Sequence, residues 1–324
     1  MKTFDEIREI IDEELGQASW DKNPHNLYEP IAYILQLGGK RIRPALTLMA
    51  CNLFSDDVEA AVKPAVGVEI FHNFTLLHDD IMDKADVRRG NQTVHKKWNE
   101  NVAILSGDGM QILAYQYLSE VETPILKQVL TVFSQTALEV CEGQQYDMDF
   151  EERETVGINE YFEMIRLKTA VLLGGALKIG ALVGGATEDA AQLLYDFGIG
   201  IGLAFQLKDD LLDTYGNEKT FGKKIGNDIL CNKKTYLLTY AMEKATDEKR
   251  SALRKCLQLP AEQSEEKISS VIEIYDELDV KTACEEQINQ YYLSAIASLE
   301  KVPVDVARKQ ELKLLAEKLM FRKD

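Results

Sequence analysis

Residues 74–90 read FTLLHDDIMDKADVRRG and place three carboxylates directly behind an apolar run. The apolar residues that lead into it, from position 62 onward, show no strand-like alternation and predict a long helix that is buried on several faces. Three carboxylates, Asp79, Asp80 and Asp83, end that helix. Like charges at i and i+4 cost a helix roughly 0.2–0.5 kcal/mol per pair, so the arrangement requires a compensating partner.

The same acidic pattern returns in FQLKDDLLD, residues 205–213, behind a second long apolar run that begins near position 190. Its carboxylates are Asp209, Asp210 and Asp213. Carboxylates at i and i+4 project from one helix face about 6 Å apart along the axis. Two such helices packed side by side would direct both acidic groups into one cavity, where cations could neutralise them.

Carboxylate oxygens of this kind favour Mg²⁺ or Mn²⁺ over zinc. Magnesium usually binds one or two carboxylates, keeps several waters and completes its coordination with substrate phosphate. A single DDxxD motif is common at solvated helix ends, but two copies, each behind a buried apolar run, favour a metal-binding site. The sequence therefore predicts a phosphorylated ligand held through metal ions.

Basic residues, several of them beside glycine, gather around these motifs, although the chain carries a net charge of −17. They are Lys40, Arg41 and Arg43 in GGKRIRP, Arg88 and Arg89 in RRG, Lys168 in LKTA, Lys223 and Lys224 in GKKIGND, and Lys233 and Lys234 in NKKTY. A neighbouring glycine lets the backbone approach a phosphate, and arginine adds a two-pronged donor. The pattern predicts two anion pockets.

The composition is that of an ordinary globular protein, with 45% hydrophobic and 28% charged residues among 324. The net charge of −17 argues against nucleic acid and against anionic membranes as partners. The apolar stretch 170–186 is interrupted by Lys178 and by glycines, so no stable membrane insertion is expected. Five scattered cysteines indicate reduced thiols, and the acidic N-terminal helix is no signal peptide, so we expect a cytoplasmic protein.

Helical periodicity runs through almost the whole chain, without a convincing strand pattern and without a linker rich in glycine, proline or serine. We expect helices near 3–17, 27–37, 43–54, 58–83, 97–120, 124–148, 158–184, 188–215, 233–246, 247–258, 262–276, 279–298 and 303–321. The simplest prediction is one all-α domain spanning residues 1–324.

The order GGKxxRP, DDxxD with RRG, GQxxD, KT, FQxxDDxxD and GKxxGxD, from about residue 38 to residue 236, resembles the trans-isoprenyl diphosphate synthases. This polyprenyl synthetase family includes the farnesyl and geranylgeranyl diphosphate synthases. The resemblance implies a bundle of long antiparallel helices around a deep cavity, and a homodimer. It also implies that the enzyme joins isopentenyl diphosphate to an allylic diphosphate and releases diphosphate.

The resemblance also assigns roles to residues. It places Mg²⁺, expected as three ions per site with Mn²⁺ as an alternative, on Asp79, Asp83, Asp209, Asp210 and Asp213, with Asp80 in support. It assigns Arg88, Lys168, Thr169, Gln206, Lys223 and Lys233 to the allylic diphosphate and its cation, and Lys40, Arg43, His72 and Arg89 to isopentenyl diphosphate. The carbon–oxygen bond of the allylic substrate breaks, and metal ions with the basic ring stabilise the departing charge.

The resemblance further implies that product length depends on Phe74, five residues before the first aspartate, with Thr75 and Phe71 beside it. An aromatic floor at this depth favours a short product, and both a C20 and a C15 product stay open, as does the allylic primer. Two other functions are compatible with parts of the pattern. A terpene cyclase would use one aspartate motif and lack the isopentenyl pocket, and a non-catalytic subunit of a heteromeric synthase would usually have lost aspartates.

Overall fold

The computed structural model describes residues 1–216 and 225–320, and nearly all of this part is helical, which confirms the prediction of an all-α protein. The chain folds into two compact units. The first unit comprises Met1–Ser134, Gly175–Leu194 and Val302–Leu312, and the second comprises Gln135–Gly174, Tyr195–Lys301 and Lys313–Asp324. Each unit carries one of the two acidic motifs.

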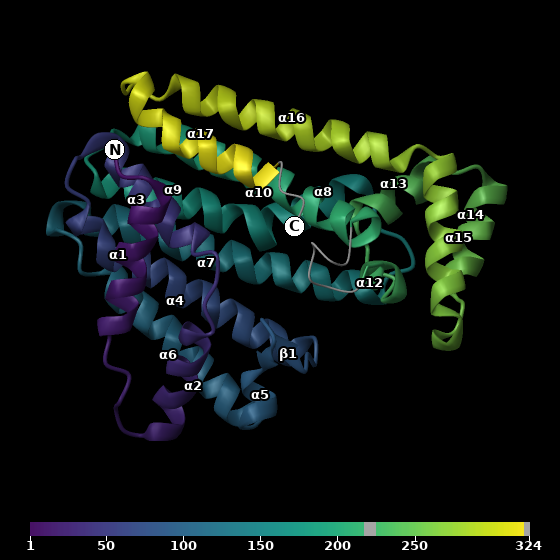
Figure 1. Ribbon diagram of the computed structural model, residues 1–324, viewed down its shortest axis with the longest axis horizontal. Coiled ribbons are helices and arrows are strands. Elements are labelled where there is room, and N and C mark those ends of the chain that lie inside the picture. Colours follow the sequence, from purple (N-terminus) through teal and green to yellow (C-terminus); the bar gives the residue numbers. More distant parts are fainter. Residues whose placement is uncertain (217–224, 321–324) are drawn as a thin grey trace. The chain divides into compact units, whose positions relative to one another are not determined.

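The first unit is built around α4 (Glu59–Met82), the helix that the opening stretch predicts. It packs against α6, α3 and α1, and Figure 1 shows α4 and α6 side by side. Gly67 lets α6 approach, since a Cβ there would lie 3.0 Å from the carbonyl oxygen of Ala114. The unit also contains α1 (Phe4–Gln17), α2 (His25–Gln36), α3 (Ile42–Phe54), β1 (Val87–Arg88), β2 (Asn91–Gln92), α5 (Val94–Lys97) and α6 (Glu100–Leu118).

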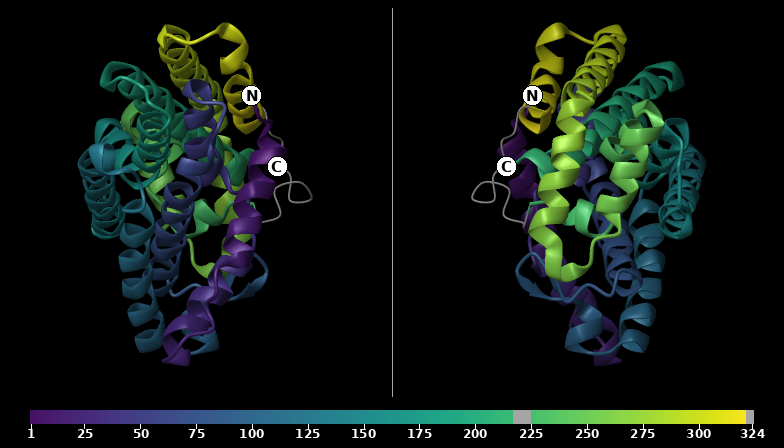
Figure 2. Two further views of the ribbon diagram at one scale, coloured as in Figure 1. Left: turned by 90° about the vertical axis from the view of Figure 1, so that its left-hand side faces the viewer. Right: turned by 90° about the vertical axis from the view of Figure 1, so that its right-hand side faces the viewer.

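The second unit contains further helices from the later part of the chain. They are α8 (Ile158–Ile165), η1 (Arg166–Ala170), α12 (Asn227–Leu230), α13 (Tyr236–Lys244), α14 (Asp247–Leu257), η2 (Ala261–Gln263), α15 (Ser264–Glu277) and α16 (Val280–Lys301). Within this unit α14 and α15 pack together as a helical hairpin (Figure 2). Helices with residues in both units are α7 (Thr123–Glu152), α9 (Val171–Val183), α10 (Glu188–Tyr215) and α17 (Val306–Met320).

The helix α10 is the one described helix long and apolar enough to cross a membrane. In the folded chain 61% of its most apolar window is buried within the protein. It also ends on Asp209, Asp210 and Asp213. These features are those of a core helix that carries a polar site at its end.

The segment predicted as one helix over 158–184 is interrupted. The structure has α8, then a single turn of π-helix, η1, and then α9. Such π turns insert one residue into an α-helix and occur frequently at functional sites. The hydrophobic periodicity on both sides is helical, so the sequence predicted the helix but gave no sign of the extra residue.

A small β-hairpin was also not predicted. Val87 pairs with Gln92 and Arg88 with Asn91, and the two central residues, Arg89 and Gly90, have φ of 52° and 76°. Positive φ at both central positions is the signature of a type I′ turn, which matches the twist of paired strands. Strands of two residues are too short to produce an alternating pattern.

Candidate functional site

The first acidic motif ends α4 in the first unit. Asp79 lies in the last turn, and Asp83 is the C-cap residue. Asp80 is only 2% exposed, and it accepts hydrogen bonds from Nε and Nη2 of Arg88 at 2.8–2.9 Å. Burial raises the pKa of Asp80, and the Arg88 guanidinium opposes that shift. The structure thus uses Asp80 to anchor Arg88 and leaves Asp79 and Asp83 at the more exposed side of the helix end.

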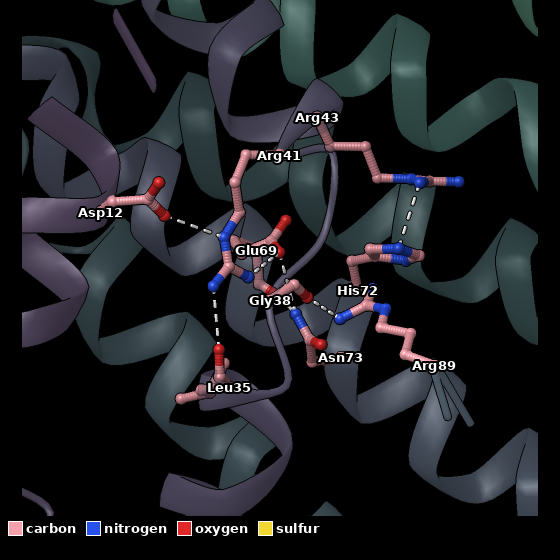
Figure 3. A network of polar contacts seen from close by, with 9 residues as sticks. All are labelled: Asp12, Leu35, Gly38, Arg41, Arg43, Glu69, His72, Asn73 and Arg89. Atoms are coloured by element: carbon pink, nitrogen blue, oxygen red, sulfur yellow. Dashed lines mark hydrogen bonds and ion pairs between the residues drawn. The ribbon is translucent and has the colours of Figure 1, made fainter. Parts of the chain in front are cut away.

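The hairpin connects the first acidic motif to the glycine-rich loop before α3. Its turn directs Arg89 to the carbonyl oxygen of Gly38, to which Nη1 donates (Figure 3). Gly39 has a φ of 151°, and a Cβ there would lie 3.1 Å from the Arg89 guanidinium. The GGK and RRG motifs, about fifty positions apart in the chain, therefore meet, as the anion-pocket prediction requires.

Arg43 and His72 form the centre of this basic cluster. Nη1 of Arg43 lies 3.1 Å from Nε2 of His72 (Figure 3). Because a guanidinium can only donate, Nε2 must accept, and His72 is neutral. Burial and the surrounding arginines, Arg43 first, hold the pKa of His72 well below its ordinary value. Nε of Arg43 is buried and has no hydrogen-bond partner within residues 1–216 and 225–320, so an anionic ligand could satisfy it.

Arg41, one residue from Lys40, does not join the basic cluster. It has a φ of 51°, is 6% exposed and turns into the unit (Figure 3). Its guanidinium donates to Glu69 at 2.6 Å, to the carbonyl of Leu35 at 2.8 Å and to Asp12 at 3.2 Å. This buried ion pair fixes the loop that presents the exposed Lys40 and the half-buried Arg43.

The residues predicted to limit product length belong to an aromatic cluster. Phe71 is fully buried and Phe74 is 7% exposed, and their ring centroids lie 5.5 Å apart. Phe133 of α7 packs edge-on against Phe71 at 5.1 Å, and Tyr115 of α6 packs against Phe133 at 4.9 Å. The half-buried Thr75 donates its hydroxyl to the carbonyl of His72 at 2.7 Å. Phe74, Phe71, Phe133 and Tyr115 therefore form one continuous series of packed rings.

The second acidic motif borders a small cavity of about 50 Å³ in the second unit. Asp147, Tyr161, Met164, Ile165, Lys168, Thr169, Gln206, Asp210, Lys233, Lys234 and Thr235 line it. Of the basic residues predicted for the allylic diphosphate in this part of the chain, Lys168 and Lys233 are thus brought together. Lys223 lies outside the residues that the structure describes.

The three aspartates of the second motif have different surroundings. Asp209 is half-buried, whereas Asp210 and Asp213 are 3% and 7% exposed. Asp213 accepts the backbone N–H of Asp228 at 2.8 Å, so it anchors the start of α12. Burial, followed by the repulsion of Asp228, raises the pKa of Asp210 to about 7.

The π turn presents Lys168 and Thr169 to the cavity. Two glycines allow neighbouring backbones to press against it: a Cβ on Gly143 would lie 2.2 Å from the amide nitrogen of Lys168, and one on Gly202 would lie 2.5 Å from Cα of Ala170. Gly143 belongs to the GQxxD motif, to which the sequence analysis assigned no function. Its last residue, Asp147, is an ion-pair partner of Lys168 that sequence reasoning missed.

The donor set fits magnesium. Within residues 1–216 and 225–320, no group of three or more His, Cys, Asp and Glu side chains is placed to enclose a metal ion. Each motif instead offers carboxylate oxygens from one helix end. Magnesium accepts one or two such ligands and takes its other oxygens from water and phosphate.

Comparison with known proteins agrees with this chemistry. The chain matches the polyprenyl synthetase family over residues 24–275. It is 42% identical over 249 residues to the geranylgeranyl diphosphate synthase of Methanosarcina mazei, covering 75% of this chain and 77% of that protein. A crystal structure of a geranylgeranyl pyrophosphate synthase superposes with a TM-score of 0.95, 44% identity and 100% coverage of both chains. A polyprenyl synthase from Caulobacter crescentus CB15, complexed with calcium and isoprenyl diphosphate, has a TM-score of 0.83, 25% identity and coverage of 99% and 94%. This protein belongs to the polyprenyl synthetase family.

Proposed function

We propose that this enzyme is a short-chain prenyltransferase that condenses isopentenyl diphosphate with an allylic diphosphate and makes geranylgeranyl diphosphate. The observation that carries the proposal is the basic cluster of Arg43, neutral His72 and Arg89. A second anion site of this kind suits a second diphosphate substrate, which a terpene cyclase does not bind. The family assignment supports the synthase and supports neither the cyclase nor the non-catalytic subunit.

In the proposed mechanism, the acidic helix ends bind Mg²⁺ for the allylic diphosphate. Asp79, Asp83 and Asp209 would hold Mg²⁺, which when bound would neutralise charge on the leaving diphosphate. Arg88, Lys168 and Lys233 would add fixed positive charge around it. Preorganised charge of this kind is usually the largest single contribution to catalysis. We carry over the expected three ions, with Mn²⁺ as the alternative, and the calcium in the Caulobacter crescentus relative supports a divalent-cation site.

The bond changes then balance without a protein base. The bond between C1 and oxygen of the allylic substrate breaks, and its electron pair leaves with diphosphate. The double bond of isopentenyl diphosphate forms a new bond to C1, and a proton passes from the resulting cation to the released diphosphate. His78 is not proposed as a base, because its Nε2 lies 3.2 Å from the carbonyl oxygen of Ile104.

The C20 product is proposed from Phe74 and from the names of the relatives. Phe74 lies five residues before Asp79 on one helix, about 7.5 Å along the axis. The Methanosarcina mazei relative, named a geranylgeranyl diphosphate synthase, supports C20 over C15. Farnesyl diphosphate as the allylic primer is the corresponding proposal.

Three further properties are part of the proposal. The two units are proposed to act as one domain, and the enzyme to work in the cytoplasm. A homodimer is supported by apolar side chains on one exposed face of α6: Ile104, Leu105 and Ile112 are 45%, 61% and 62% exposed. A second copy of the chain would cover them.

The test is a condensation assay with labelled isopentenyl diphosphate, Mg²⁺ and, separately, dimethylallyl, geranyl and farnesyl diphosphate. Chromatography of the dephosphorylated products should show a linear C20 alcohol. A cyclic hydrocarbon formed from the allylic diphosphate alone would replace the proposal by the cyclase, and inactivity with every primer would replace it by the subunit.

A further inference from the structure

A chain of hydrogen bonds runs through the wall of the cavity in the second unit. Thr169 donates its hydroxyl to Oε1 of Gln206 at 3.2 Å, and Nε2 of Gln206 donates to Oδ1 of Asp210 at 3.1 Å. Tyr161 donates its hydroxyl to Oδ2 of Asp210 at 2.6 Å, and the backbone N–H of Tyr236 donates to the same oxygen at 3.2 Å. Donors from α8 (Tyr161), from α10 itself (Gln206) and from the start of α13 (Tyr236) thus converge on one carboxylate.

The direction of this chain is fixed by its inner end. The backbone N–H of Tyr236 can only donate, and the Tyr161 hydroxyl donates beside it, so Asp210 acts as the acceptor. The ionised carboxylate of Asp210 can only accept at Oδ1, so the amide of Gln206 presents its NH₂ group to Oδ1 and its oxygen to Thr169. Because the hydroxyl proton of Thr169 is committed to that oxygen, the lone pairs of Thr169 Oγ1 are left for the cavity.

The inner end is also rigid. Tyr161 is 1% exposed, and its ring lies 5.7 Å from that of Phe162 and 6.2 Å from that of Tyr236. Asp210 lies within α10 and is 3% exposed. A buried, satisfied network of this kind holds its members in one arrangement more firmly than separate pairs would.

Since both oxygens of Asp210 accept hydrogen bonds inside the protein, a positioning role suits Asp210 better than the metal-ligand role expected from the motif. We infer that Tyr161 and Asp210 are positioning residues that orient the Gln206 amide and the Thr169 hydroxyl, so that the Thr169 oxygen faces the allylic cation. The inference rests on the proposed function, in which that cation forms beside Thr169. An oxygen with its lone pairs directed at developing positive charge stabilises it without reorganising.

The main test is Tyr161→Phe, with Tyr240→Phe as the matched control. Tyr240 stacks on Tyr236 at 5.6 Å in the same aromatic group, and within residues 1–216 and 225–320 its hydroxyl makes no hydrogen bond. We expect Tyr161→Phe to lower kcat about 10- to 100-fold while KM for isopentenyl diphosphate stays unchanged, because a displaced group costs rate in the chemical step. Tyr240→Phe should match the wild type, and both variants should keep the thermal midpoint of the wild type within a few degrees.

A double-mutant cycle that combines Tyr161→Phe with Thr169→Val distinguishes positioning of the Thr169 hydroxyl from a loss of packing around Tyr161. If the chain orients the Thr169 hydroxyl, removing that hydroxyl first should abolish most of the effect of Tyr161→Phe on kcat. Thr169→Ser, which keeps the hydroxyl, should restore the full effect. An undiminished effect in the Thr169→Val background would overturn the inference.

If Tyr161→Phe fails to fold, Asp210→Asn gives a second test. Its amide can turn an NH₂ group toward Gln206 and reverse the chain, so kcat should fall at least as far as in Tyr161→Phe. A wild type that is active, with Tyr161→Phe and Asp210→Asn equally active, would refute the positioning role alone. A wild type inactive with every pair of diphosphates would refute the proposed function, and the positioning role with it.

Discussion

The ammonium of Lys168 lies 2.5 Å from the carboxylate of Asp147, at the edge of the cavity in the second unit. The side chains are 27% and 18% exposed, so water screens the pair only partly. A diphosphate that binds Lys168 must compete with Asp147 and is itself repelled by that carboxylate.

Asp147→Asn should therefore tighten binding of the allylic diphosphate. Removing one negative charge within a few ångströms of the ligand is expected to lower its KM about tenfold, equivalent to roughly 1.4 kcal/mol. Steady-state kinetics at low and high salt would measure this, and the gain should shrink at high salt. Asp149→Asn is the control, since Asp149 lies on the same helix and is exposed. An unchanged or higher KM would show that Asp147 chiefly positions Lys168.

Asp79→Asn and Asp209→Asn should each lower kcat by about a thousandfold, since a lost metal ligand removes several kcal/mol of charge stabilisation. The substitution removes a charge from helix ends that are not fully buried, so the thermal midpoint should not fall. Activity should also vanish with a chelator and return with Mg²⁺. The control is Asp86→Asn, a carboxylate whose side chain is 76% exposed and which pairs with Lys96. A near-normal rate in Asp79→Asn or Asp209→Asn would show that the substituted aspartate is not a metal ligand.

Phe74→Ala should lengthen the product by at least one five-carbon unit, because it removes the first ring of the aromatic cluster. Phe71 and Phe133 remain behind it, so the extension should stop after one or two units. Chromatography of dephosphorylated products would measure the distribution. Phe71→Ala alone should change the product less, since the ring of Phe74 still lies in front. An identical product distribution in Phe74→Ala would show that another group is the floor.

The helices were predictable where one apolar face continues without interruption. The expected helix 188–215 and the observed α10 agree because its apolar run is flanked by Glu188 at the start and Gly216 after the end. The π turn was not predictable, because its cause lies elsewhere in the chain. Gly143 and Gly202 permit the close approach of other backbones, and no pattern within 158–184 reports on that.

The sequence predicted which residue types make up the candidate site, but it did not predict the direction in which each side chain points. Arg41 and Arg43 look equivalent in GGKRIRP, yet the backbone at Arg41 is left-handed, and Arg41 turns toward Glu69 while Arg43 meets His72. The six aspartates likewise look equivalent. Burial of Asp80 and Asp210 depends on Arg88 and Tyr161, which tertiary packing supplies.

The buried ion pair of Arg41 and Glu69 should contribute much more to stability than the more exposed ion pair of Arg41 and Asp12. Both side chains are at most 5% exposed, so Arg41→Met leaves a buried carboxylate and should cost about 3–5 kcal/mol of unfolding free energy. Asp12→Asn should cost less than about 1 kcal/mol, because the side chain of Asp12 is 52% exposed. Urea unfolding would measure both. Equal costs for the two variants would contradict the assigned role of Glu69.

His72 should make the stability depend on pH in a defined direction. Its pKa in the folded chain lies well below the ordinary value, owing to burial and then to Arg43. As pH falls below about 6.5, the unfolded chain binds a proton that the folded chain does not, so the free energy of unfolding falls. His72→Gln removes this proton uptake. Urea unfolding between about pH 7 and pH 5 should therefore show a smaller loss of stability in His72→Gln than in the wild type. His25→Gln is the control, since the side chain of His25 is 68% exposed, and it should follow the wild type. Parallel losses in all three proteins would show that His72 becomes protonated in the folded state, and the neutral acceptor in the basic cluster would have to be abandoned.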